Sequence, residues 1–298
     1  MRRLRIIFQN NKDIKMPNRP VDLTPAPSGL SQMKRLISIA TICGLLSSTT
    51  FAQDSRLYDP SIQHMPQDGV VKLYGAGGPH TAFQKVADAW TRKTGKRVVI
   101  IAGPEHTWSA KAQTDADILW GTSEQSMTAF LDTYKTFSSK QVEPIYIRPT
   151  IIAVKKGNPK NIKRFEDLLE DGVKIVVTEG GEGANTSGTG TWEDVAGRLG
   201  RLEDIRSFRR NIVAFGKGSG ASLKAFKELD ADAWITWPDW PVTYSDVLDE
   251  VAIAPERQIW RDVNVALSPV ADPEAKEFLD FLVTKEAQAL MKTEGWVR

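Results

Sequence analysis

A loop dense in glycine, serine and threonine joins an apolar run to a helical pattern in the second half of the chain. The apolar run is Val173–Val177, the loop begins at Thr178, and apolar residues recur at helical spacing from Trp192 onward. Glycines let backbone N–H groups turn inward, hydroxyls add donors, and a helix N-terminus adds oriented N–H groups. This stretch therefore predicts a strand, a loop that can cradle an anion, and a helix.

Two nucleotide-binding motifs are excluded in the same loop. A P-loop requires a lysine, and none stands between Thr178 and Trp192. A dinucleotide fingerprint requires a third glycine where this chain has Thr186. A plain strand-to-helix connection without a ligand is the alternative interpretation. The anion cradle is favoured because the pattern recurs along the chain.

The same order of strand, loop and helix occurs in the first half of the chain. Strands are predicted at Val70–Tyr74, Arg97–Ile101 and Ala116–Trp120, and each is followed by a polar or glycine-rich loop. This alternation predicts an α/β fold with parallel strands, in which ligands bind beyond the carboxyl ends of the strands. The loops should therefore meet at one rim, and the extended stretch Pro144–Val154 should cross between two domains.

Residues 1–52 are interpreted as an upstream extension followed by a secretory signal peptide over residues 33–52. Met33–Arg35 is basic, Leu36–Leu46 is a short apolar run, and Thr50–Ala52 offers a cleavage site before Gln53. Residues 1–32 lack an amphipathic pattern, so we expect translation to begin at Met33.

The leader also carries the excess of positive charge. The whole chain has a net charge of +2, and residues 1–52 hold eight Lys/Arg against two Asp/Glu, which leaves −4 for the remainder. An acidic surface argues against nucleic acid or an anionic membrane as partner. The only cysteine, Cys43, lies in the leader, and no later stretch is long and apolar enough for membrane insertion. We expect a free periplasmic protein without disulfides.

The predicted rim loops offer mostly neutral hydrogen-bond donors near helix starts. They are Gly77, His80, Thr81, His106, Thr107, Ser123, Thr186, Ser187, Thr189, Ser219 and Gly220. Trp237, at a strand end, is favoured as a ring that contacts the ligand. Several charge-assisted bonds of about 1.5–3 kcal/mol each can hold a dianion without a formal counter-charge. The expected site uses no cofactor and no metal.

Two alternatives rely on ionisable residues instead. His80 or His106 could act as base for Ser187 in a hydrolase, or bind zinc, but neither G-x-S-x-G nor H-E-x-x-H occurs. Arg148 and Arg261 flank the predicted crossings, and a guanidinium there could clamp a carboxylate.

Several stretches together carry a family resemblance: Leu73–Thr81, Asp117–Gln125, Ala184–Trp192, Asp232–Trp237, Arg261–Asn264, Ala275–Leu282 and Glu286–Gln288. On these, the chain resembles type II periplasmic solute-binding proteins, including the sulfate- and molybdate-binding proteins, and most of all the accessory colonisation factor AcfC family. The resemblance implies a two-domain α/β periplasmic-binding-protein-like fold, in which each domain is a mostly parallel sheet flanked by helices. It implies domain I at 54–148 and 264–298, and domain II at 149–263.

The resemblance also implies a function. A monomer would capture a small anion between its domains, without catalysis, and deliver it to an ABC permease. The implied cleft loops add Trp108 and Gly188 to the candidate residues, and closure would bend the chain at Pro149–Ile152 and Asn264–Ala266. The ligand is expected to be a sulfate- or molybdate-like oxyanion or a small organic acid. A histidine-dependent hydrolase and a ligand-sensing colonisation factor are the alternatives.

We predict that the exported protein begins at or near Gln53, because Lys34, Arg35, the apolar run and Ala52 form a complete signal. Mass spectrometry of the periplasmic fraction measures this. Recovery of peptides from residues 1–32 in that fraction would contradict the prediction.

Overall fold

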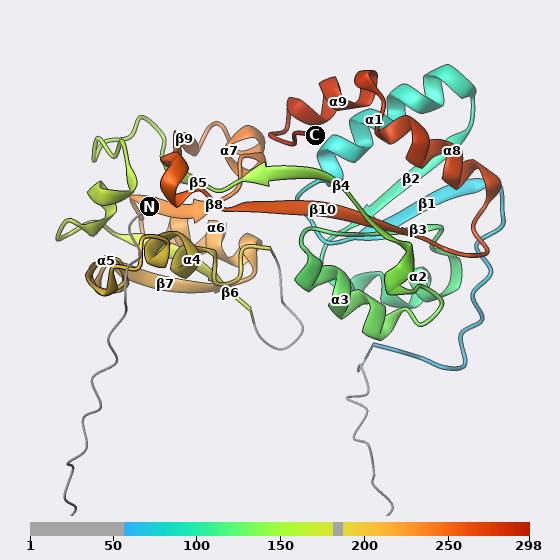
Figure 1. Cartoon of the computed structure of the whole chain (residues 1–298), viewed down its shortest axis with the longest axis horizontal. Coiled ribbons are helices and arrows are strands. Elements are labelled where there is room, and N and C mark those ends of the chain that lie inside the picture. The colour runs from blue at the N-terminus through green and yellow to red at the C-terminus, as the bar shows by residue number, and fades with distance from the viewer. Residues whose placement is uncertain (1–56, 181–186) are drawn as a thin grey trace, which may run out of the picture. The chain divides into compact units, whose positions relative to one another are not determined.

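Two five-stranded sheets organise the residues that the computed structural model describes, which are 57–180 and 187–298 (Figure 1). The first sheet has the strand order β2-β1-β3-β10-β4, and the second has the order β7-β6-β8-β5-β9. We call each sheet, with the helices that pack on it, a lobe.

The first lobe is built from both ends of the described chain. Its strands are β1 (Val70–Gly75), β2 (Arg97–Ala102), β3 (Ile118–Gly121), β4 (Val142–Pro149) and β10 (Trp260–Leu267). Its helices are α1 (His80–Thr94), α2 (Ser109–Asp115), α3 (Glu124–Thr133), α8 (Pro273–Leu282) and α9 (Lys285–Lys292), with 3-10 turns η1 (Glu105–Thr107) and η2 (Ser139–Gln141).

Helices cover both faces of the first sheet. Side chains alternate along each strand, so Ile118 and Trp120 join a cluster with α1, α8 and α9, while Leu119 joins one with α2 and α3. In the first cluster the rings of Trp90 and Phe278 meet edge to face at 5.5 Å. This layer arrangement holds the strand ends, and therefore the loops that follow them, in fixed positions.

The second lobe is continuous in sequence for most of its length. Its strands are β5 (Ile151–Lys155), β6 (Ile175–Glu179), β7 (Ile212–Lys217), β8 (Ala233–Thr236) and β9 (Leu248–Ala252). Its helices are α4 (Thr191–Gly197), α5 (Leu202–Arg210), α6 (Ser219–Glu228) and α7 (Asp239–Thr243), with 3-10 turns η3 (Phe165–Leu169) and η4 (Pro255–Arg257). Again α4 and α5 pack on one face of the sheet, and α6 and α7 on the other.

Both sheets are mixed. Strand β1 is parallel to β2 and β3, whereas β10 is antiparallel to β3 and β4. Strand β6 is parallel to β7 and β8, whereas β5 is antiparallel to β8 and β9. In each sheet four strands run in the same direction and one strand, β10 or β5, runs against them, so the expected α/β fold with mostly parallel sheets is confirmed. Parallel neighbours need a crossover connection, and β5 and β10 enter their sheets directly from the other lobe.

The two crossing segments are hydrogen-bonded to each other, and β4 and β10 run side by side (Figure 1). Between β4 and β5, Thr150 donates its N–H to the Ile259 carbonyl at 2.8 Å. Gln258 Nε2 donates to the Thr150 carbonyl at 2.6 Å. The first predicted bend, Pro149–Ile152, coincides with a crossing, while the second, Asn264–Ala266, lies inside β10. Within the described residues, no helix has the length and apolarity that a membrane span requires.

We expect Arg257→Ala to lower the free energy of unfolding by about 3–5 kcal/mol, the scale for breaking a buried ion pair. Arg257 is buried, pairs with Asp204, and donates to the carbonyls of Val195 and Ala196 at 3.3 Å. Urea denaturation measures the loss.

Arg164→Ala is the control for that change. In the unmodified protein the guanidinium of Arg164 lies 3.4 Å from Asp167 on the surface. Surface ion pairs contribute about 0–1 kcal/mol to the free energy of unfolding. Losses of equal size in the two variants would contradict a structural role for Arg257.

Candidate functional site

The buried side chain of Arg148 lies where the two lobes meet. It extends from the end of β4 in the first lobe, forms an ion pair with Asp239 through Nη1, and donates from Nη2 to Ser187 Oγ at 2.9 Å. Both partners belong to the second lobe. One guanidinium therefore connects the last residues of a first-lobe strand with two elements of the other lobe.

Two indole rings enclose the same guanidinium. Its Cζ atom lies 4.7 Å from the ring centroid of Trp237 and 4.3 Å from that of Trp296. Burial lowers the pKa of Arg148, and the charge of Asp239 opposes this shift. Arginine stays protonated in proteins, so the site contains a true cation.

The loop between β1 and α1 approaches Arg148 closely from the first lobe. Gly78 has a φ of +103°, and a Cβ atom there would lie 3.3 Å from both terminal nitrogens of Arg148. The same Cβ would lie 3.5 Å from Thr122 Cγ2, in the loop after β3. Glycine is required because the backbone is left-handed and the space beside it is occupied. The loops after the parallel strands β1 and β3 thus reach one place, as expected.

Predicted donor residues of the second lobe also come together. A Cβ atom at Gly188 would lie 3.2 Å from Thr178 and 3.4 Å from Ser219 Oγ, so the loop before α4 packs against the end of β6 and the start of α6. Ser187 is 6% exposed, and its carbonyl accepts a hydrogen bond from Thr191 Oγ1 at 3.0 Å. Ser187, Gly188 and Ser219 therefore form one cluster, which we call the donor cluster.

His80 begins α1 on the first-lobe side. His80 is an exposed residue, and partial desolvation lowers the pKa of its imidazole, while the charges of Asp239 and Glu294 oppose this shift. Glu294 is buried, pairs with Lys85, and accepts from Thr81 Oγ1 at 3.2 Å. The predicted residues His80 and Thr81 therefore lie near the second-lobe carboxylate of Asp239 and the end of the chain.

Other predicted site residues have structural roles. Trp108 is buried, stacks on Tyr134 at 5.8 Å, and donates to the Gly103 carbonyl at 3.1 Å. Thr107 Oγ1 donates to the Pro104 carbonyl at 2.7 Å.

The rest of the predicted set lies as follows. Ser123 caps α3, His106 is exposed in η1, Gly77 and Gly220 are exposed, and Thr189 is half-buried. Thr186 is outside the described residues.

Arg261, the second arginine considered as a clamp, forms an ion pair with a different aspartate. Arg261 is the register partner of Arg148 across β4 and β10, but its Nη2 atom lies 2.6 Å from Asp194. Both arginines lie at the crossings, as expected, and each pairs with a second-lobe aspartate, but only Arg148 is buried. A clamp on a ligand carboxylate stays a prediction. Asp239 and Trp296 were missed by the sequence analysis, since each lies outside any glycine-rich pattern, whereas Thr122 belongs to the predicted loop after β3.

The hydrolase alternative paired Ser187 with a histidine base, whereas the structure pairs Ser187 with Arg148. Ser187 Oγ accepts from Arg148, so the hydroxyl faces a cation instead of an imidazole base. The described chain also contains no cluster of three or more His, Cys, Asp or Glu side chains suited to a metal ion.

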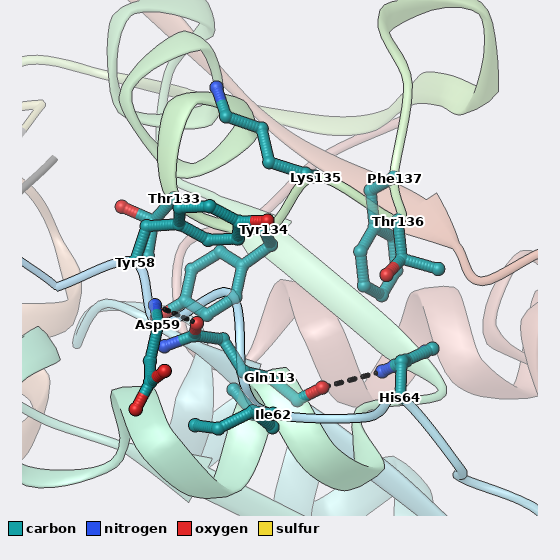
Figure 2. A pocket seen from close by; sticks show the side chains of 11 residues that line it. Tyr58, Asp59, Ile62, His64, Gln113, Thr133, Tyr134, Lys135, Thr136 and Phe137 are labelled. Carbon is teal, nitrogen blue, oxygen red and sulfur yellow. Dashed lines mark hydrogen bonds between the residues drawn. The ribbon is translucent and has the colours of Figure 1, made fainter. Parts of the chain in front are cut away.

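A cavity of about 230 Å³ lies elsewhere in the first lobe, between residues 58–64 and the helices α2 and α3 (Figure 2). Two of its polar side chains, Gln113 and His64, are hydrogen-bonded within the protein. Gln113 Oε1 accepts from the N–H of Asp59 at 2.8 Å, and the Gln113 carbonyl lies 2.9 Å from His64 Nδ1. These bonds attach the segment before β1 to the lobe, which is a structural role.

Comparison with known proteins adds independent findings. A model of the family described as bacterial extracellular solute-binding protein matches residues 71–297. No curated protein matches the chain. The chain is similar to the crystal structure of Peb3 from Campylobacter jejuni, with 44% sequence identity, a TM-score of 0.72, and coverage of 76% of this chain and 99% of that one. The structure of PEB3 with bound L-phospholactate gives 44% identity, a TM-score of 0.73 and the same coverage.

More distant structures share the fold. The sulfate-binding protein SubI from Mycobacterium tuberculosis H37Rv has 16% identity and a TM-score of 0.62, with coverage of 77% of this chain and 86% of that one. The periplasmic molybdate-binding protein of Azotobacter vinelandii has 15% identity and a TM-score of 0.57, with coverage of 76% and 99%.

We expect Asp239→Ala to lower the free energy of unfolding by about 3–5 kcal/mol, because it leaves the cation of Arg148 buried without its carboxylate. Chemical denaturation measures this loss. Asp280→Ala is a matched control, since its pair with Lys276 is on the surface and such pairs contribute about 0–1 kcal/mol. An Asp239 variant as stable as the control would show that the pair does not hold the lobes.

Proposed function

Since this chain belongs to the family of bacterial extracellular solute-binding proteins, we propose that it captures a small anion where its two lobes meet. The anion is bound and released without chemical change. Domain I comprises 54–148 and 264–298, domain II comprises 149–263, and bending at the crossings near Thr150 and Ile259 opens and closes the site.

The buried guanidinium of Arg148 is the observation that carries this proposal. It lies beside the donor cluster of the second lobe and the glycine loop of the first. A cation acts strongly on an anion where water is excluded, and charge-assisted hydrogen bonds are about twice as strong as neutral ones. The anion is therefore held by a formal charge together with hydroxyl and backbone donors, instead of by neutral donors alone.

The similarity to PEB3 supports a choice of ligand class. At 44% identity, that protein has been crystallised with L-phospholactate, a small acid that carries a phosphoryl group and a carboxylate. The sulfate- and molybdate-binding structures, at 16% and 15% identity, support the fold only. We therefore favour a small phosphorylated organic acid over an inorganic oxyanion.

The predicted leader and the family membership support a role as a periplasmic receptor for a transporter. The signal peptide directs the chain to the periplasm, where the monomeric receptor passes its anion to an ABC permease.

A thermal-shift screen with L-phospholactate, inorganic phosphate, sulfate, molybdate and tricarboxylates tests the function. A ligand raises the unfolding free energy by RT ln(1 + [L]/Kd), so the preferred anion gives the largest shift. We expect the largest shift with L-phospholactate, and Ser219→Ala should weaken its binding by about 1–3 kcal/mol, the scale for a lost bond to a charged group.

Calorimetry measures the affinity of the variant, and Ser245→Ala, at an exposed position of the second lobe, is its control. A flat response to the whole panel would refute anion binding. If the Ser219 variant binds as tightly as the control, the donor cluster is not part of the binding site.

A further inference from the structure

Trp237, Arg148 and Trp296 form a stack that draws on three parts of the chain, and we call it the tryptophan–arginine stack. Trp237 follows β8, Arg148 is the penultimate residue of β4, and Trp296 lies in the segment after α9. The guanidinium lies between the two rings, and the three side chains are at most 2% exposed.

The stack holds three buried donors that lack an acceptor among the described residues. They are Arg148 Nε, Trp237 Nε1 and Trp296 Nε1. Buried N–H groups are nearly always paired, and leaving one unpaired costs about 1–3 kcal/mol. All three atoms can only donate, so acceptor oxygens are the chemical complement of the stack.

The charges around the stack favour a monoanionic group. The Nη atoms of Arg148 are already used by Asp239 and Ser187, which leaves Nε as the free edge of the guanidinium. Asp239 repels further negative charge at short range, and this repulsion is greater for a dianionic phosphoryl group than for a carboxylate. A carboxylate, planar and purely an acceptor, suits these donors better.

The chain end is fixed in a way that holds Trp296 in the stack. Gly295 has a φ of +81°, and a Cβ atom there would overlap Pro238 of the second lobe. Val297 forms an antiparallel bridge with Ile147 of β4, and Arg298 Nη1 donates to the Ile145 carbonyl at 2.9 Å. Trp296 is therefore set between the two lobes by neighbours on each side, as a built part of the junction.

We propose that the tryptophan–arginine stack is a carboxylate subsite, distinct from the donor cluster, so that the ligand carries two anionic groups. This inference rests on the proposed function and specifies it further. The donor cluster holds the phosphoryl group, and the N–H groups of Trp237 and Trp296 with Arg148 Nε hold the carboxylate. Trp296 is then a specificity-determining residue that favours phosphorylated acids over inorganic phosphate.

Tryptophan-to-phenylalanine changes test the subsite, because they delete the N–H donor and keep an aromatic ring over the guanidinium. We expect Trp296→Phe to weaken L-phospholactate binding roughly tenfold or more, the loss of one bond to a charged group, and to leave inorganic phosphate binding within roughly twofold. Trp260→Phe is the control, since Trp260 is 47% exposed. Calorimetry gives both affinities, and thermal denaturation verifies that the variants fold.

The indole resonances of the unmodified protein provide a second readout that does not depend on a variant being stable. In ¹H–¹⁵N spectra, L-phospholactate should shift the Trp296 indole N–H, and inorganic phosphate should leave it in place. Equal weakening of both anions in Trp296→Phe, or an indole signal that ignores L-phospholactate, would overturn the subsite while anion binding stands. If neither anion binds the unmodified protein, the proposed function fails together with the subsite.

Discussion

A single buried positive charge sets the relation between the two lobes. Arg148 belongs to the first lobe, yet its ion pair with Asp239 and its bond to Ser187 are made to the second. A buried cation without a partner costs several kcal/mol, so the two lobes are held at the spacing that this pairing demands. The residues around Arg148 leave space for its guanidinium and cover it. Gly78 must lack a side chain, and two indole rings close over the guanidinium faces.

Local patterns in the sequence predict most of the elements but not their pairing. Glycine-rich loops after apolar runs located β1, β3 and β6, because a strand and its exit loop are specified by adjacent residues. The antiparallel partners were missed, since β10 finds its place between β3 and β4 through contacts far away in sequence.

For the site and the family, too, local sequence patterns were predictive and long-range contacts were not. The serine and glycine loops predicted Ser187 and Ser219, which the structure brings into one cluster. Arg148 was foreseen only as an alternative, because nothing in a sequence shows that a lone arginine before a proline is buried. Trp108 had been expected at the ligand, but its ring completes an aromatic core. The resemblance to type II periplasmic solute-binding proteins is confirmed, since its motifs span the region that the family model matches.

The place of β4 in the sheet also bears on how the protein is synthesised. Its neighbour in the sheet is β10, and among the described residues it also forms a bridge to Val297, so both partners lie far along the chain. Because a chain is delivered from its N-terminus, β4 appears before the whole second lobe, when neither partner is available. Such long-range pairing slows folding and leaves an unpaired strand edge exposed meanwhile. The second lobe, nearly contiguous in sequence, can fold first and then carry β10 back to its partner.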